Sequence, residues 1–133
     1  MVEASVIWTD RERFVGQASS GHAVVMEVGE KKTASTPIEL VLIALCGCTA
    51  YDVVNILNKK RERFTSLEVS AKAERAANPP AIYTEIHLKY RIGGKPSPKA
   101  VEDAVKLSEE KYCSVGAMVN KTAKITYEIE YVD

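Results

Sequence analysis

The sequence predicts an α+β fold with the element order βββ–α–ββ–α–β, formed by a single domain of residues 1–133. Three observations support this fold class. Short β-like segments come first, a long apolar segment without proline follows, and segments with period-two alternation come later. Because the strands occur in groups rather than alternating singly with helices, antiparallel runs are favoured.

The first three strands are expected at 3–9, 11–18 and 22–28. Each segment is short and rich in residues that favour strands. The Ser19–Gly21 cluster is a turn signal between the second and third strands. Together these features predict an antiparallel meander.

The long helix has a clear predicted start. Thr36 can cap it, Pro37 suits the first helical position, and Glu39 completes a Thr-x-x-Glu capping box. No proline follows until well beyond Lys60, where the helix is expected to end. The first half of this segment is apolar on every side, which predicts burial in the protein centre or in a subunit interface.

The second half of the chain contains three more strands and one more helix. Strands are expected at 67–74 and 82–92, separated by a break at 78–80. A helix is predicted over 97–113, and a last strand over 125–131. The residues expected to share one face of the strand 82–92 are Ile82, Thr84, Ile86, Leu88, Tyr90 and Ile92.

Composition and charge exclude several classes of protein. Eighteen basic residues balance eighteen acidic ones, so no global field attracts nucleic acid or an anionic membrane. The N-terminus lacks the pattern of a signal peptide, and the uncharged run 40–51 is short for a membrane span of about 20 residues. Three cysteines are a poor basis for a secreted disulfide framework. We therefore expect a cytoplasmic protein with reduced thiols.

The three cysteines are the main candidates for chemistry. Cys46 and Cys48 are two residues apart on one helix, so their side chains point about 200° apart at about 100° per residue. Only one of them can share a face with Cys113, which lies at the end of the other helix. Two such thiols form a redox pair if the fold brings them together. The alternative is that each cysteine is a small buried apolar residue.

The acidic and histidine residues near these positions allow several interpretations. Asp52 is four residues after Cys48 on the same helix face. Either it pairs with a base from another segment, and the pair polarises the thiol site, or it is simply hydrogen-bonded at the point where the helix begins to leave the protein interior. Glu39 is most simply the capping-box acceptor. His22 and His87 are isolated, so a metal site is weakly supported and no cofactor is expected.

Three segments carry a resemblance to the OsmC/Ohr family of thiol-dependent peroxide reductases, and the resemblance extends, element by element, over nearly the whole chain. They are 36–40, 47–54 and 110–115, and the last two are most similar to the YhfA-like branch of that family. The resemblance implies an intertwined homodimer with two long helices buried between sheets. It also implies active sites at the subunit interface.

The resemblance further implies roles for the cysteines. Cys48 matches the peroxidatic cysteine, whose thiolate attacks a hydroperoxide and becomes a sulfenic acid. Cys113 matches the resolving cysteine, which condenses with it to a disulfide. A dithiol such as a lipoyl group is the implied type of reductant, and Cys46 matches no catalytic position.

The sequence departs from the peroxidase pattern beside the long helix. Peroxidases of the family carry an arginine in the loop before this helix and a glutamate just after its proline. Here Ile38 occupies the glutamate position, Glu39 follows it, and the stretch 27–35 offers Lys31 and Lys32 without an arginine. A lysine supplies a point charge but not a planar bidentate donor.

Two other functions therefore remain open from the sequence. One is a protein of the same fold that binds a small apolar molecule without catalysis. The other is a thiol redox sensor that acts on another protein. Neither nucleic acid nor a membrane is expected as a partner.

Overall fold

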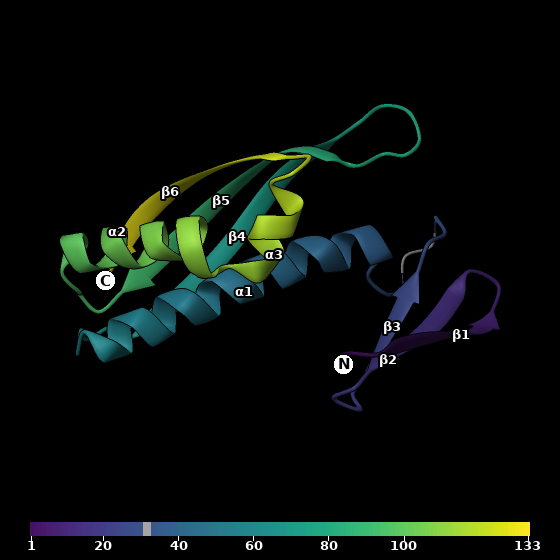
Figure 1. Ribbon diagram of the computed structural model, residues 1–133, viewed down its shortest axis with the longest axis horizontal. Helices are drawn as coiled ribbons and strands as arrows, with labels where there is room; N and C mark the ends of the chain where they lie inside the picture. Colours follow the sequence, from purple (N-terminus) through teal and green to yellow (C-terminus); the bar gives the residue numbers. More distant parts are fainter. Residues whose placement is uncertain (31–32) are drawn as a thin grey trace. The chain divides into compact units, whose positions relative to one another are not determined.

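The computed structural model describes residues 1–30 and 33–133. The chain forms two compact units, residues 1–43 and 44–133. The mixed α+β class predicted from the sequence is confirmed, with two three-stranded sheets. The long helix α1 (Pro37–Lys59) begins in the first unit and continues into the second (Figure 1).

The first unit contains the predicted meander. Strands β1 (Ala4–Asp10), β2 (Arg13–Ala18) and β3 (Ala23–Glu27) form an antiparallel sheet in sequence order. Arg11 in the first turn and Gly21 in the second have φ angles of 47° and 85°, the left-handed values that let the chain reverse tightly.

A small polar cluster follows this sheet. The Glu27 carboxylate accepts hydrogen bonds from the backbone N–H and the hydroxyl of Thr33, and Arg13 donates to the same hydroxyl oxygen. These Thr33 hydrogen bonds favour the charged form and lower the pKa of Glu27 below its ordinary value. The cluster ties the end of β3 to the segment that leads into α1.

The predicted capping box at the start of α1 is confirmed. The Thr36 N–H donates to Glu39 Oε1 at 2.9 Å, and the Glu39 N–H donates to Thr36 Oγ1 at 3.2 Å. Two backbone donors of the first turn, which have no partner within the helix, are thereby satisfied reciprocally.

The sheet of the second unit has the order β4–β5–β6, formed by Ser66–Arg75, Tyr83–Gly93 and Lys124–Val132. Strands β4 and β5 are antiparallel, as expected. The expectation of antiparallel pairing is wrong for β6, which runs parallel to β5. The physical reason is the long helical connection between them, because parallel neighbours require a crossover of a dozen or more residues.

The alternation along β5 is confirmed in its main part and wrong at its start. Ile86, Leu88, Tyr90 and Ile92 are buried as expected, but Ile82 is 41% exposed and Tyr83 is buried. The register shifts between Glu74 and Arg75, so that Arg75 pairs with Tyr83. Such an irregularity changes which residues face inward, and sequence alternation alone does not reveal it.

The predicted second helix is also different in the structure. Helix α2 (Pro98–Leu107) ends early, a single π-helical turn η1 (Ser108–Tyr112) follows, and a separate helix α3 covers Ser114–Val119. Cys113 lies between η1 and α3 with an extended backbone. It therefore caps the start of a third helix, which the sequence analysis did not predict, rather than ending the second.

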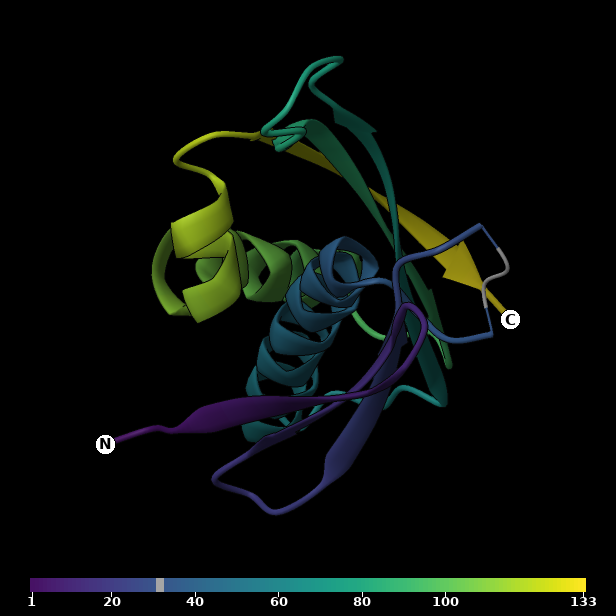
Figure 2. The same cartoon turned by 90° about the vertical axis from the view of Figure 1, so that its right-hand side faces the viewer.

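The helices of the second unit cover one face of its sheet. From residue 44 on, α1 lies on the same face of the sheet as α2 and α3 (Figures 1 and 2). The buried residues of α1 recur every fourth position, which places them on one stripe of the helix. They are Leu45, Thr49, Val53 and Leu57.

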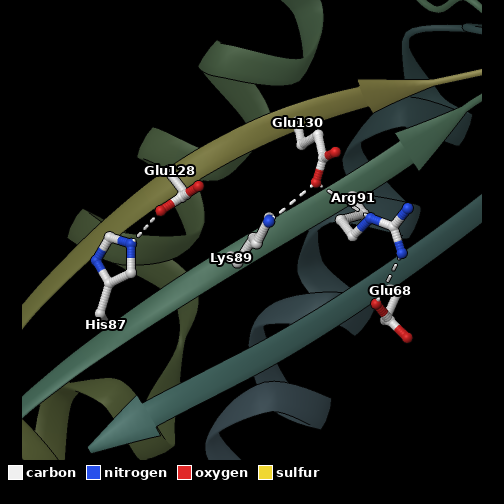
Figure 3. Close-up of polar contacts among 6 residues, drawn as sticks. All are labelled: Glu68, His87, Lys89, Arg91, Glu128 and Glu130. Atoms are coloured by element: carbon white, nitrogen blue, oxygen red, sulfur yellow. Dashed lines mark hydrogen bonds and ion pairs between the residues drawn. The ribbon is translucent and has the colours of Figure 1, made fainter.

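The opposite face of this sheet carries a charged ladder (Figure 3). His87 contacts Glu128, while Lys89 and Arg91 both contact Glu130 at 3.1 Å. The side chains are all roughly half exposed, so each pair contributes at most about 1 kcal/mol. These ion pairs account for the polar residues that alternate along β5, so no catalytic or binding role is needed to explain them.

Helix α1 is long and apolar enough to cross a membrane by length and composition alone, with a mean hydropathy of 2.0 over its most apolar window. The short uncharged run in the sequence had indicated otherwise. However, Thr49 and Asp52 near its middle make hydrogen bonds to other elements of the second unit. These hydrogen bonds join the middle of α1 to β5 and η1.

Candidate functional site

The structure brings Cys48 and Cys113 together in the second unit. Cys48 lies on α1, whereas Cys113 caps α3, and the thiol of Cys48 is a hydrogen-bond partner of the Cys113 thiol. Both cysteines are free. The contact joins two segments far apart in the sequence, which is the condition for a working redox pair.

Cys113 is the more enclosed of the two thiols. Its side chain is 6% exposed, and its sulfur accepts a hydrogen bond from the Gly116 N–H at 3.3 Å. Burial is the main cause that raises the pKa of Cys113 well above its ordinary value, and the neighbouring Cys48 and Asp52 raise it further. Cys113 is therefore a protonated thiol at neutral pH.

Gly116, in the first turn of α3, lies close to the Cys113 thiol. A side chain at Gly116 would place its Cβ 3.2 Å from the Cys113 sulfur, tighter than ordinary contact. The glycine therefore lets the helix backbone approach the thiol and donate to it.

The other two cysteines lie on α1 and are half-buried. Since residues two apart on a helix point about 200° apart, Cys46 is turned away from the side on which Cys48 meets Cys113. Burial raises the pKa of Cys46. Of the two thiols on α1, Cys48 is thus the one that contacts Cys113, and it remains partly exposed to solvent.

A chain of polar side chains lies directly beside this pair. Thr49 Oγ1 is 2.7 Å from both Tyr90 Oη and Ser108 Oγ. Ser108 Oγ is in turn 2.9 Å from Asp52 Oδ2, and Tyr90 Oη is 2.7 Å from Glu109 Oε1. The three hydroxyl residues have no exposed surface, so the chain is a continuous buried polar path between two carboxyl groups.

The π-helical turn holds this path against the thiols. The Cys113 N–H donates to the Ser108 carbonyl oxygen at 2.9 Å, which closes the wide turn. The turn carries Ser108 and Glu109 at its start and leads directly to Cys113. Isolated π turns are frequent at functional sites, because the inserted residue changes the direction of side chains locally.

The pKa values of two members of this path are shifted by burial. Desolvation is the largest cause in both cases, and it raises the pKa of Glu109 and strongly raises the pKa of Tyr90. The phenol is therefore neutral across the physiological range. Glu109 retains its proton to a higher pH than an exposed glutamate does.

The two ends of the path face different hollows in the second unit. Asp52 lines a hollow of about 460 Å³, and Glu109 lines another of about 640 Å³. The first also contains the apolar side chains of Ile56, Leu107 and Tyr112. A small molecule could reach the Asp52 end without entering the protein core.

Among the remaining predicted residues, Asp52 belongs to the polar path beside the thiols. Asp52 is half-buried and hydrogen-bonded by Ser108, so its partner is a hydroxyl rather than a base. Glu39 belongs to the capping box of the first unit. Lys31 and Lys32 lie outside the described residues.

Sequence reasoning missed four residues of the polar path, namely Thr49, Tyr90, Ser108 and Glu109. A weak signal existed for two of them. Thr49 is a polar residue within an apolar helix segment, immediately after Cys48, and Tyr90 lies on the apolar face of its strand. Such residues require buried hydrogen-bond partners, but their partners come from other elements.

Comparison with known proteins gives a consistent result. The family described as OsmC-like protein matches residues 29–128. Protein YhfA from Escherichia coli K12 is 39% identical over 132 residues, which cover 98% of each chain. A crystal structure of a hypothetical protein from Aquifex aeolicus VF5 is 35% identical, with a TM-score of 0.86 over 100% of this chain and 98% of that one.

A more distant likeness supports the fold alone. The crystal structure of an organic hydroperoxide resistance protein OsmC from Legionella pneumophila has a TM-score of 0.73 at 13% identity, covering 98% of this chain and 96% of that one. The family match and the identity to YhfA extend over most of the sequence. The chain therefore belongs to the OsmC family.

Proposed function

We propose that this protein is a thiol-dependent redox protein that reduces organic hydroperoxides. Cys48 is the peroxidatic cysteine and Cys113 the resolving cysteine. The observation that carries this proposal is the contact between these two thiols, one half-buried on α1 and one enclosed beside η1. The difference in enclosure assigns the first attack to Cys48, because a buried thiol with a raised pKa is a poor nucleophile.

The proposed chemistry has two steps. The Cys48 thiolate attacks one peroxide oxygen, the O–O bond breaks, and the alcohol leaves with a proton while the sulfur becomes a sulfenic acid. Cys113 then loses its proton and attacks the Cys48 sulfur, so that an S–S bond replaces the S–OH bond and water leaves. The sum converts two thiols and one hydroperoxide into a disulfide, an alcohol and water.

The names of distant relatives agree with this reaction class. The Legionella pneumophila protein and a structure from Elizabethkingia anophelis are both described as organic hydroperoxide resistance proteins. Lys31 or Lys32 is proposed to supply the positive charge that an arginine supplies in the peroxidases of the family. Asp52 and Glu39 are proposed as supporting residues, the first beside the thiols and the second at the helix start.

The proposal includes a cytoplasmic homodimer that is re-reduced by a dithiol, of which a lipoyl group is the expected type. Exposed apolar surface on the single chain supports the dimer, because soluble monomers rarely leave so much uncovered. The exposed residues are Val6, Ile7, Trp8, Val24, Val25, Ile43 and Tyr51. Size-exclusion chromatography with light scattering tests this point, and a monomeric mass at micromolar concentration would contradict it.

The main experiment exposes the reduced protein to one equivalent of cumene hydroperoxide, blocks the remaining thiols with N-ethylmaleimide, and maps the products by mass spectrometry. We expect a Cys48–Cys113 disulfide with Cys46 blocked. Cys48→Ser should abolish the reaction. Cys113→Ser should stop it at a Cys48 sulfenic acid that dimedone traps.

Cys46→Ser is the matched control, since it removes a thiol from the same helix without removing either member of the pair. It should form the disulfide at the wild-type rate. Three thiols that remain unreacted in the wild-type protein would overturn the proposal.

A second function has one specific observation in its favour. Ile38 stands where peroxidases of the family carry glutamate, and the hollow beside Asp52 is partly apolar. A protein that binds a small apolar ligand without peroxide chemistry fits both facts. It predicts unreacted thiols in the experiment above and a ligand that native mass spectrometry finds on the purified protein.

A further inference from the structure

The polar path beside the thiols contains more hydrogen-bond contacts than its hydroxyl groups can supply with protons. Four contacts of 2.7 to 2.9 Å connect Glu109, Tyr90, Thr49, Ser108 and Asp52 in that order. Each contact joins two oxygen atoms and requires one hydrogen between them. The three hydroxyl groups provide three hydrogens in total.

Two ionised carboxylates would therefore leave one contact without a hydrogen. Two oxygen lone pairs would then face each other at hydrogen-bond distance inside the protein, which is unfavourable at low dielectric. Water does not relieve the conflict at the centre, because Thr49, Tyr90 and Ser108 have no exposed surface. One further proton, carried by one carboxyl group, completes all four contacts.

We infer that Asp52 and Glu109 share a single proton, and that the five side chains form a continuous proton path through the second unit. With the proton on Glu109, every hydrogen bond points toward Asp52. With the proton on Asp52, every hydrogen bond points toward Glu109. The two arrangements differ only in the positions of hydrogens, so the path transfers a proton from one end to the other without moving heavy atoms.

The surroundings of the two carboxyl groups decide where the proton rests. Burial raises the pKa of Glu109, so Glu109 is its resting site. At the other end, the charge of Asp52 acts on the Cys113 thiol. The titratable and charged groups around Asp52 are Cys48, Cys113, Tyr51, Lys59, Lys60 and Tyr112. Those around Glu109 are Lys121, Lys124 and Tyr127.

The use of this path rests on the proposed function. Disulfide formation removes the proton of Cys113 and delivers a proton to the hydroxide that leaves Cys48. Asp52, which is unprotonated while the shared proton rests on Glu109, is the group placed to accept the first proton and to pass it to the hydroxide, so the step leaves no excess charge. The path keeps Asp52 available for this role by holding the shared proton at the Glu109 end. No oxidant other than the hydroperoxide enters this balance.

The shared proton is tested first by infrared spectroscopy, without any peroxide. A protonated carboxyl group has a C=O stretch separate from that of a carboxylate. We expect this signal in wild-type protein at pH 7, shifted when glutamate is labelled with carbon-13 and lost in Glu109→Gln. Glu110→Gln is the matched control, since Glu110 is exposed on the same π turn, and the signal should persist.

The transfer along the path is tested by the rate of the Cys48–Cys113 disulfide between pH 5 and pH 8. Thr49→Val removes the central hydroxyl at nearly constant volume. We expect it to slow the reaction about tenfold or more and to flatten its pH profile, since general acid–base assistance is lost. Thr49→Ser keeps the hydroxyl and should rescue both.

These outcomes separate the inference from the proposed function. If wild-type protein forms the disulfide but Thr49→Val has the same rate and pH profile, the path is not used and the redox function stands. If wild-type protein forms no disulfide, the redox function fails, and the infrared signal alone decides the shared proton. If no protonated carboxyl signal disappears in Glu109→Gln, the inference is overturned.

Discussion

Thr49 on α1 and Tyr90 on β5 form a 2.7 Å hydrogen bond at a point where neither residue has exposed surface. The bond lies in the stripe of α1 that otherwise buries only leucine and valine. Thr49 also directly follows Cys48, so the bond fixes the segment of the helix that carries this cysteine to the sheet. A buried polar pair of this kind specifies the helix orientation more narrowly than apolar packing does.

Replacing Thr49 by valine should lower the free energy of unfolding by about 1–3 kcal/mol. The substitution preserves the side-chain volume but leaves Tyr90 and Ser108 each without one partner. Urea unfolding followed by circular dichroism measures the effect. Thr49→Ser, which keeps the hydroxyl and loses a methyl group, should be less destabilising, and a valine variant as stable as wild type would contradict the prediction.

The apolar part of the same stripe should be more sensitive to truncation. Leu57 is fully buried, so Leu57→Ala should cost about 2–5 kcal/mol through lost contacts and the cavity left behind. Asn58 is its exposed neighbour and provides the control, since Asn58→Ala should change stability by less than about 0.5 kcal/mol. Equal effects of the two substitutions in urea unfolding would show that α1 is not packed as described.

The sequence was sufficient to predict the elements that local rules control. The capping box of Thr36 and Glu39, the meander of β1–β3 and the inner face of β5 from Ile86 on all follow from spacing and capping. Each depends on residues close together in the chain. The family resemblance also directed attention to the two cysteines that the structure brings together.

The remaining features depend on contacts between distant segments. The π turn interrupts a segment whose composition is compatible with one helix, and it is held by the Cys113–Ser108 backbone bond and by the side-chain bonds of Ser108. The parallel pairing of β6 depends on the whole crossover. The polar path is assembled from α1, β5 and η1, so no local pattern predicts it.

Cys113 should be the slowest cysteine to react with iodoacetamide in the reduced native protein near neutral pH. It is buried, and its raised pKa leaves little thiolate. Timed labelling with mass spectrometry measures the three rates, and urea-denatured protein, in which the rates should converge, is the control. Cys48→Ala should speed labelling of Cys113 only modestly, because burial is the larger cause of the shift. Labelling of Cys113 before Cys46 and Cys48 would contradict this account.

Glu109 should make the folded protein less stable as the pH rises from 5 to 8. Burial raises the pKa of this carboxyl in the folded state above its ordinary value of 4.5. The folded state therefore holds a proton that the unfolded chain has already released. The stability that this proton contributes is complete below pH 4.5 and is lost as the pH rises through the folded-state pKa.

The comparison of wild type with Glu109→Gln isolates this effect, because glutamine is neutral at every pH. Wild-type protein should lose stability between pH 5 and pH 8 relative to Glu109→Gln, as measured by urea unfolding at both values. Carboxyls with lowered pKa values titrate below this window and do not contribute; they are Glu27, Glu128 and Glu130. Glu110→Gln should follow wild type. If Glu109→Gln instead loses as much stability as wild type over this range, Glu109 is ionised in the folded protein at pH 5 already, and burial does not hold its proton.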